Sequence, residues 1–116
     1  MSGAKEAPDP GDPNGTGSAR IRVNPAERRV CFVIRMNNID PSVAAHIHRG
    51  RAGQAGDIVV PLFEGRSTAH RRSGCVNGLS RSLLREIARR PRRFYVNVHT
   101  QNFPAGAIRG QLRRPT

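Results

Sequence analysis

Apolar and polar residues alternate over several short segments of this chain, as expected for β-strands with one buried face. Residues 19–25 alternate in this way, and residues 29–39 are rich in β-branched and aromatic residues. NPAER supplies a turn between them, so the pair predicts a β-hairpin. A second hairpin is expected where the loop QNFPAG separates the last two strands. In all, we expect strands over residues 19–25, 29–39, 43–48, 58–63, 94–100 and 107–112.

One segment, residues 80–90, has the pattern of an α-helix. Ser80 is placed to cap its N-terminus, and Pro91 stops it. Its arginines face water, and its apolar stripe consists of Leu83, Leu84, Ile87 and Ala88. The segment therefore predicts a short helix that covers one side of the core.

These elements predict an all-β fold, an antiparallel β-sandwich or Greek-key barrel with one short covering helix. Pro61 places the strand over residues 58–63 at a sheet edge or at its own end. The length of 116 residues allows one core, so we expect a single domain, residues 1–116, whose residues 1–18 form an irregular N-terminal segment.

Histidine gathers on one predicted sheet face. Because side chains alternate across a strand, Ala45 and Ile47 share one face of AAHIHRG while His46 and His48 share the other. Two later strands show the same division between an apolar and a polar side. The polar sides of the three strands carry His46, His48, Asn97, His99, Arg109 and Gln111.

Two histidines at i and i+2 have Cα atoms roughly 6.6 Å apart, so both rings can reach one ion. His99 on a neighbouring strand would complete a set of three nitrogens, which suits Cu, Zn, Ni or Fe and leaves a position open. The alternative is that these rings hydrogen-bond to the backbone and to one another as structural groups. His70 lies in a polar segment beside two arginines and is left out of the set.

Charge and composition narrow the function classes. The formal charge is +12, and Lys5 is the only lysine among 20 basic residues. The arginines are spread along the chain without interleaved aromatic residues, so a solvated basic surface is favoured over nucleic-acid binding. No apolar run approaches the ~18 residues that span a bilayer, and MSGAKEAPDP lacks the apolar stretch of a secretory signal.

The acidic and nucleophilic residues give hydrolysis or group transfer little support. The acids have no spacing for paired acid and base roles, and the chain has neither G-x-S-x-G nor a phosphate-binding glycine loop, so no catalytic residue is assigned. Cys31 and Cys75 fit no metal-ligand spacing. They predict either one disulfide in an exported domain or two reduced, buried thiols in a cytosolic one.

Four segments together resemble the CHRD domain, named from chordin and found widely in bacterial secreted proteins. They are SGAKEAPDPGDPNGTGSARI, NNIDPSVAAHIHRGRAGQAGDIVVPLF, SGCVNG and FYVNVHTQNFPAGAIRGQL. The resemblance implies an antiparallel β-sandwich or barrel, usually behind a signal peptide, in a secreted, periplasmic or cell-surface protein. It also implies that Cys31 and Cys75 form the disulfide seen in bacterial members.

A fainter similarity links the H-x-H strand, the glycine-rich segment after it, and the later histidine and arginine to the copper-binding strand of copper/zinc superoxide dismutases. It implies that His46, His48 and His99 occupy copper-ligand positions and that Arg109 guides an anion. GRAGQAGD lacks the histidines of a zinc subsite, and a fourth copper ligand is missing.

The leading hypothesis is thus a secreted or cell-envelope domain that binds a transition metal through His46, His48 and His99, copper foremost and zinc second, for copper holding or redox protection. Asn97, Arg109 and Gln111 would orient the rings. The alternative is a non-catalytic structural or protein-interaction module, and a copper-only superoxide dismutase-like enzyme comes third. The sequence identifies no protein partner.

Overall fold

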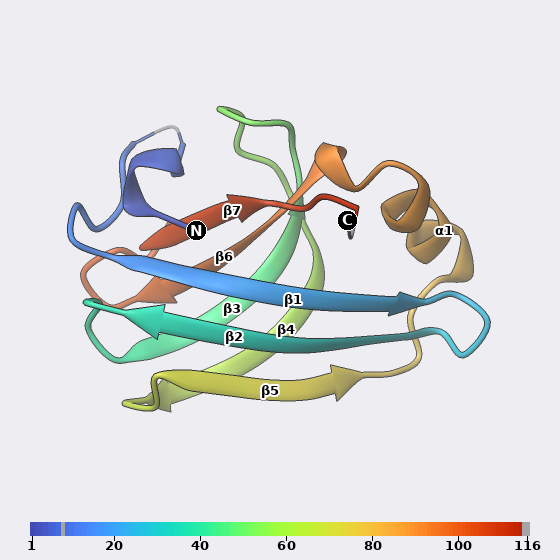
Figure 1. Ribbon diagram of the computed structural model, residues 1–116, viewed down its shortest axis with the longest axis horizontal. Helices are drawn as coiled ribbons and strands as arrows, with labels where there is room; N and C mark the ends of the chain where they lie inside the picture. Colours follow the sequence, from blue (N-terminus) through green and yellow to red (C-terminus); the bar gives the residue numbers. More distant parts are fainter. Residues whose placement is uncertain (8, 115–116) are drawn as a thin grey trace.

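The structure is a computed structural model that describes residues 1–7 and 9–114. Within these residues, seven strands form two antiparallel sheets that pack as a β-sandwich (Figure 1). The three-stranded sheet has the order β1-β2-β5 and the four-stranded sheet the order β4-β3-β6-β7. The strands are β1 (Thr16–Asn24), β2 (Arg29–Asn37), β3 (Ser42–Arg49), β4 (Ile58–Ser67), β5 (Arg71–Val76), β6 (Phe94–Thr100) and β7 (Ile108–Gln111).

The strand pattern predicted from the sequence is confirmed in six places and incomplete in one. The two predicted hairpins are β1–β2 and β6–β7, and β4, which carries Pro61, is an edge strand as expected. The strand missed is β5, which pairs with β2. Its sequence RRSGCV is mostly exposed in an edge strand, so it has no apolar alternation to reveal it. β1 begins at Thr16, within the segment predicted to be irregular.

The described residues also form three helical segments, namely α1 (Arg81–Arg89) and the short 3-10 turns η1 (Gly3–Lys5) and η2 (Pro91–Arg93). The Ser80 side chain accepts a hydrogen bond from the Leu83 backbone N–H and so caps α1 as predicted. Leu84 and Ile87 are buried against the sheets, whereas Ala88, which the sequence placed in the apolar stripe, is exposed. No helix among the described residues is long and apolar enough to cross a membrane.

The core between the sheets is built from aliphatic side chains and a few aromatic rings. Its buried members include Val30, Ile34, Met36, Ala45, Ile47, Val60, Leu84, Phe94, Val96, Val98 and Ile108. Cys31 on β2 and Cys75 on β5 face each other in the register and form a disulfide, as the resemblance implied.

The outer face of the four-stranded sheet is covered as well, and this is where the histidines lie. All seven residues of β6 are buried. The N-terminal segment is held over this sheet by a hydrogen bond from the Asp12 N–H to the Ala107 carbonyl, and the loop over residues 50–57 is held by one from the Gly50 N–H to the Arg93 carbonyl. The polar side chains on this face are therefore inside the protein.

Candidate metal centre

The three predicted ligands come together on the covered face. His46 and His48 lie on β3, where they are opposite Asn97 and Tyr95 of β6, and His99 is opposite Ala44. The three side chains are 7–9% exposed, and one ligand atom from each lies within 4.8 Å of the others. In the described part of the chain this is the one group of three or more such residues that could hold a metal ion.

Backbone carbonyls fix two of the rings. The Nδ1 atoms of His48 and His99 each lie 2.9 Å from a carbonyl oxygen, that of Gly56 and that of Pro104 respectively. A carbonyl only accepts, so in both rings Nδ1 carries the proton and Nε2 carries the lone pair. Hydrogen bonds of this kind orient histidine ligands in metal sites.

The third ring, that of His46, faces the cluster with Nδ1 and not with Nε2. Nδ1 of His46 lies 2.9 Å from Nε2 of His99. Nε2 of His48 is buried and has no hydrogen-bond partner among the described residues. Because Nε2 of His99 accepts, Nδ1 of His46 donates in this hydrogen bond, so the His46 proton has to move to its own Nε2 before Nδ1 can bind an ion. The nitrogens directed at the centre of the cluster are thus Nδ1 of His46 and Nε2 of His48 and His99.

The surroundings keep the rings of His46 and His99 neutral. Burial, and then the neighbouring His99 and His48, lower the pKa of His46 to about 4. Burial also lowers the pKa of His99, although the Pro104 carbonyl partly opposes this. Only neutral imidazole binds a metal, so at pH 7 both rings have the required charge, and only the tautomer of His46 has to change.

The spacing fits a metal ion after small side-chain movements. Bonds of about 2.0–2.1 Å to a tetrahedral ion place two ligand nitrogens roughly 3.3 Å apart. The nitrogens of His46 and His99 are slightly closer than that, at 2.9 Å, and the full group spans 4.8 Å. The widest separation has to shrink by about 1.5 Å, which rotations about χ1 and χ2 can supply.

The residues predicted to orient the rings lie around them in different ways. Asn97 is next to the cluster, and its Nδ2 lies 3.5 Å from the Ala105 carbonyl. Arg109 acts through an aromatic ring: its guanidinium carbon is 3.4 Å from the centre of Tyr95, which stacks on His48 with ring centres 4.8 Å apart. Gln111 donates to the carbonyls of Gly50 and Arg92 and so holds the loop over residues 50–57 rather than a histidine.

Arg109 has a position that the dismutase comparison did not imply. It is 1% exposed, and its Nη2 donates to the Arg51 carbonyl at 2.8 Å. A guanidinium beneath a loop is not placed to guide an anion from solvent, and burial lowers its pKa. Its contacts instead tie the loop over residues 50–57 to the Tyr95 ring.

Two further residues belong to the site. Tyr95 shares the face of the histidines, so the strand alternation could have identified it, and its hydroxyl accepts a hydrogen bond from the Gly56 N–H at 3.2 Å. Glu6 has no such signal, because it precedes every strand. It is 7% exposed, and burial raises its pKa to about 7, although a hydrogen bond from Asn97 and the charge of Arg109 partly offset that rise.

Two glycines let the covering segments approach the sheet. Gly106 has φ +137°, and a Cβ there would lie 2.3 Å from Glu6 Oε2. At Gly56, whose carbonyl accepts from His48, a Cβ would lie 1.6 Å from the Arg49 carbonyl oxygen. A side chain at Gly56 therefore requires the backbone to move, whereas one at Gly106 would displace the Glu6 carboxyl group and adopt a strained φ.

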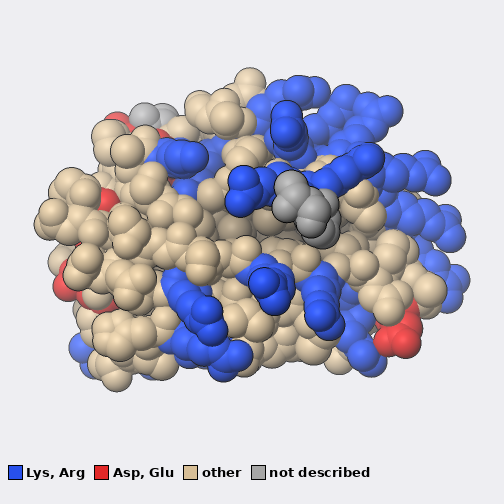
Figure 2. Space-filling view, viewed as in Figure 1, with Lys and Arg blue, Asp and Glu red and all other residues tan. Residues whose placement is uncertain are grey.

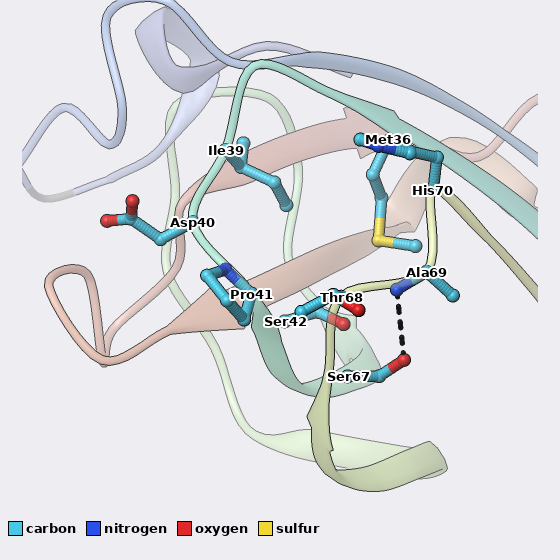
Figure 3. Close-up of a pocket in the computed structure, with 9 residues that line it drawn as sticks. All are labelled: Met36, Ile39, Asp40, Pro41, Ser42, Ser67, Thr68, Ala69 and His70. Atoms are coloured by element: carbon cyan, nitrogen blue, oxygen red, sulfur yellow. Dashed lines mark hydrogen bonds between the residues drawn. The ribbon is translucent and has the colours of Figure 1, made fainter.

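His70, which the sequence left out of the set, does not join the cluster. Its backbone carbonyl accepts a hydrogen bond from the Met36 N–H, and its side chain is exposed. It borders a cavity of about 260 Å³, whose other lining residues include Asp40, Ser42 and Ser67 (Figure 3). None of the three clustered histidines lines this cavity.

The comparisons with known proteins give a family but no individual relative. The family described as the CHRD domain matches residues 1–112 of the chain. Neither the curated proteins nor the solved structures gave a match.

Proposed function

This chain belongs to the CHRD domain family, and we propose that it binds one transition-metal ion, copper foremost, through His46, His48 and His99. CHRD domains are typically extracellular, and the Cys31–Cys75 disulfide is consistent with that. The proposed setting is therefore secreted, periplasmic or at the cell surface. The proposed role is to hold copper or to protect against its redox chemistry.

The observation that carries the proposal is the buried Nε2 of His48, which has no hydrogen-bond partner in the part of the chain that the structure describes. The Gly56 carbonyl holds its ring with the lone pair toward the other two histidines. A purely structural histidine would be expected to satisfy both nitrogens, since an unpaired buried acceptor costs about 1–3 kcal/mol. A metal ion would use that lone pair together with Nδ1 of His46 and Nε2 of His99.

The donor set supports the choice of metal. It consists of three imidazole nitrogens, with no thiolate or carboxylate in the group. Such ligands suit Cu and Zn and disfavour Mg and Ca, and a given nitrogen site generally binds Cu²⁺ more tightly than Zn²⁺. Asn97, Arg109 and Gln111 would preserve the arrangement, the last two through Tyr95 and the loop over residues 50–57.

Calorimetric titration of Cu²⁺ and Zn²⁺ into metal-free protein tests the proposal. We expect one ion per chain, bound more tightly for Cu²⁺. Replacement of His48 with Ala removes the nitrogen that has no hydrogen-bond partner and should weaken metal binding by more than tenfold. His70→Ala, the matched control outside the cluster, should change the affinity little. Circular dichroism of each variant checks the fold. Affinity equal to that of a His-containing peptide, or equal loss in both variants, would remove the proposal.

A second candidate function is a non-catalytic interaction module, favoured by arginines gathered at one end of the molecule (Figure 2). On that hypothesis the histidines are structural. Replacement of His46 with Ala would then lower the melting temperature equally with and without added Cu²⁺. Superoxide dismutase activity, the third hypothesis, is tested with a superoxide assay on copper-loaded protein and its His48→Ala variant.

A further inference from the structure

The two sheets approach each other at one pair of edges, and the first two residues of the chain join them there. β1 is the edge of one sheet and β7 the edge of the other (Figure 1). Ser2 forms antiparallel bridges with both Thr16 and Arg109. It exchanges backbone hydrogen bonds with Arg109, at 2.9 and 3.0 Å, and Met1 exchanges two with Gly17. Met1 and Ser2 thus act as a very short strand between β1 and β7.

Past the Met1–Gly17 pair the same two edges continue, and no strand of the described residues lies between them. They border a groove of about 1280 Å³, with β1 on one side and residues 110–114 on the other. That volume exceeds the roughly 300–1,000 Å³ of small-molecule pockets, and its shape follows two strand edges. The groove therefore suits an extended ligand.

The backbone phase on both sides is set by the bonds to Met1 and Ser2. In an antiparallel ladder, alternate residues direct both N–H and C=O to the same side. The backbone N–H and C=O of Gly17 point to Met1, so those of Ala19, Ile21 and Val23 point into the groove. Arg109 faces Ser2, so Gln111 faces the groove from the other side. In the part of the chain that the structure describes, no backbone hydrogen bond crosses the groove beyond Met1.

The residues that line the groove indicate which kind of ligand would fit it. Its apolar surface comes from the partly buried side chains Ile21, Val23 and Leu112, and the buried Ile87 and Val96 lie beneath it. Its basic residues are Lys5, Arg22, Arg51, Arg92, Arg113 and Arg114, and its lining includes no Asp or Glu from residues 1–7 and 9–114. Figure 2 shows basic side chains concentrated around this region and over the end that holds α1. An apolar floor with a purely basic rim favours an occupant that is both apolar and acidic.

We propose that this groove binds an extended acidic peptide of a partner protein as an additional strand between β1 and β7. Main-chain bonds to Ala19, Ile21 and Val23 would hold the peptide, which runs antiparallel to β1 in continuation of Met1 and Ser2. One face of the peptide would place apolar side chains on the floor, and acidic side chains would meet the arginines. A second copy of this chain does not fit, because its charge of +12 repels an identical molecule.

The test uses fluorescence anisotropy with a labelled, acetylated heptapeptide that alternates glutamate and valine. We expect binding with one peptide per chain. The same sequence with lysine in place of glutamate, or with N-methylated amides at alternate positions, should not bind. Binding of the N-methylated peptide at equal strength would overturn the strand-addition mode, because that peptide keeps its charges but loses its backbone donors.

Variants of the protein locate the site. Arg113→Glu places a negative charge on the rim that would repel the acidic peptide. It should weaken binding at least about tenfold, which corresponds to about 1.4 kcal/mol. Arg71→Glu, an exposed residue of β5 outside the groove, makes the same charge change and should alter affinity by less than about twofold. Equal weakening by both substitutions, or full competition by heparin, which has no peptide backbone, would overturn the proposal and leave only a general polyanion surface.

Ala19→Pro tests the backbone contact separately. Residue 19 directs its N–H to the groove and has a small side chain, so proline there removes a donor to the peptide without removing a β1–β2 bond. We expect peptide binding to be lost at an unchanged circular dichroism spectrum. None of the three clustered histidines lines the groove, so copper binding should be the same in all of these variants.

Discussion

Glu6 gives the sharpest prediction of how burial at the site affects stability. Its carboxyl group is 7% exposed, Oε2 has no hydrogen-bond partner among the described residues, and its pKa is raised from 4.5 to about 7. The folded state therefore binds this proton more tightly than the unfolded state does. Stability is gained as the pH falls from 7 toward 4.5, and the full penalty of a buried carboxylate is present above pH 7.

The difference in pKa sets the magnitude. At about 1.4 kcal/mol for each pKa unit, the penalty above pH 7 amounts to at most about 3 kcal/mol. Glutamine has the shape of a protonated glutamate and cannot ionise. Glu6→Gln should therefore raise the free energy of unfolding by up to about 3 kcal/mol at pH 8.5 and by less than about 1 kcal/mol at pH 4.5.

Urea unfolding at the two pH values, with the disulfide intact, measures both differences. Glu64→Gln is the matched control, because Glu64 is exposed on β4 and should give a small and similar change at both pH values. A gain from Glu6→Gln that is the same at pH 8.5 and pH 4.5 would refute the assignment of a buried, ionising carboxyl group.

Three further predictions concern the site and its support. The folded pKa of His46, about 4, lies below its usual value, so the unfolded state binds the proton more tightly. In the Glu6→Gln variant without metal, the free energy of unfolding should therefore fall by about 1.4 kcal/mol per pH unit as the pH drops from about 6.5 to about 4. The further substitution His46→Gln should flatten that slope in urea unfolding. Cys31→Ser with Cys75→Ser opens a loop with a sequence separation of 44 and should cost about 4 kcal/mol in the same assay, whereas no change would mean that the cross-link does not constrain the unfolded chain. Gly106→Ala should lower stability by about 1–3 kcal/mol in thermal unfolding because its φ of +137° is strained for alanine, and an unaltered melting temperature would contradict this.

The sequence predicted that the three histidines lie on one face because strand alternation is a local rule. His46, His48 and His99 each share a face with polar neighbours and oppose apolar residues on the same strand, so their common side could be read without knowing the strand order. The order then brought β3 beside β6. Tyr95 could have been included on the same reasoning.

Glu6 and β5 could not be predicted in that way, because neither has a periodic signal. Glu6 belongs to the site only because residues before β1 fold back over the four-stranded sheet. β5 is a polar edge strand whose position depends on the β2 edge and the disulfide between Cys31 and Cys75. Which carbonyls would hold the histidine rings was also beyond the sequence, since Gly56 and Pro104 lie in loops.

The position of a bound ion tests the central claim most directly. A crystal of the copper-loaded protein, measured at the copper absorption edge, should show one anomalous peak about 2 Å from Nδ1 of His46 and from Nε2 of His48 and His99. A peak at His70 or at the chain terminus, or no peak at the cluster with excess copper, would contradict the account.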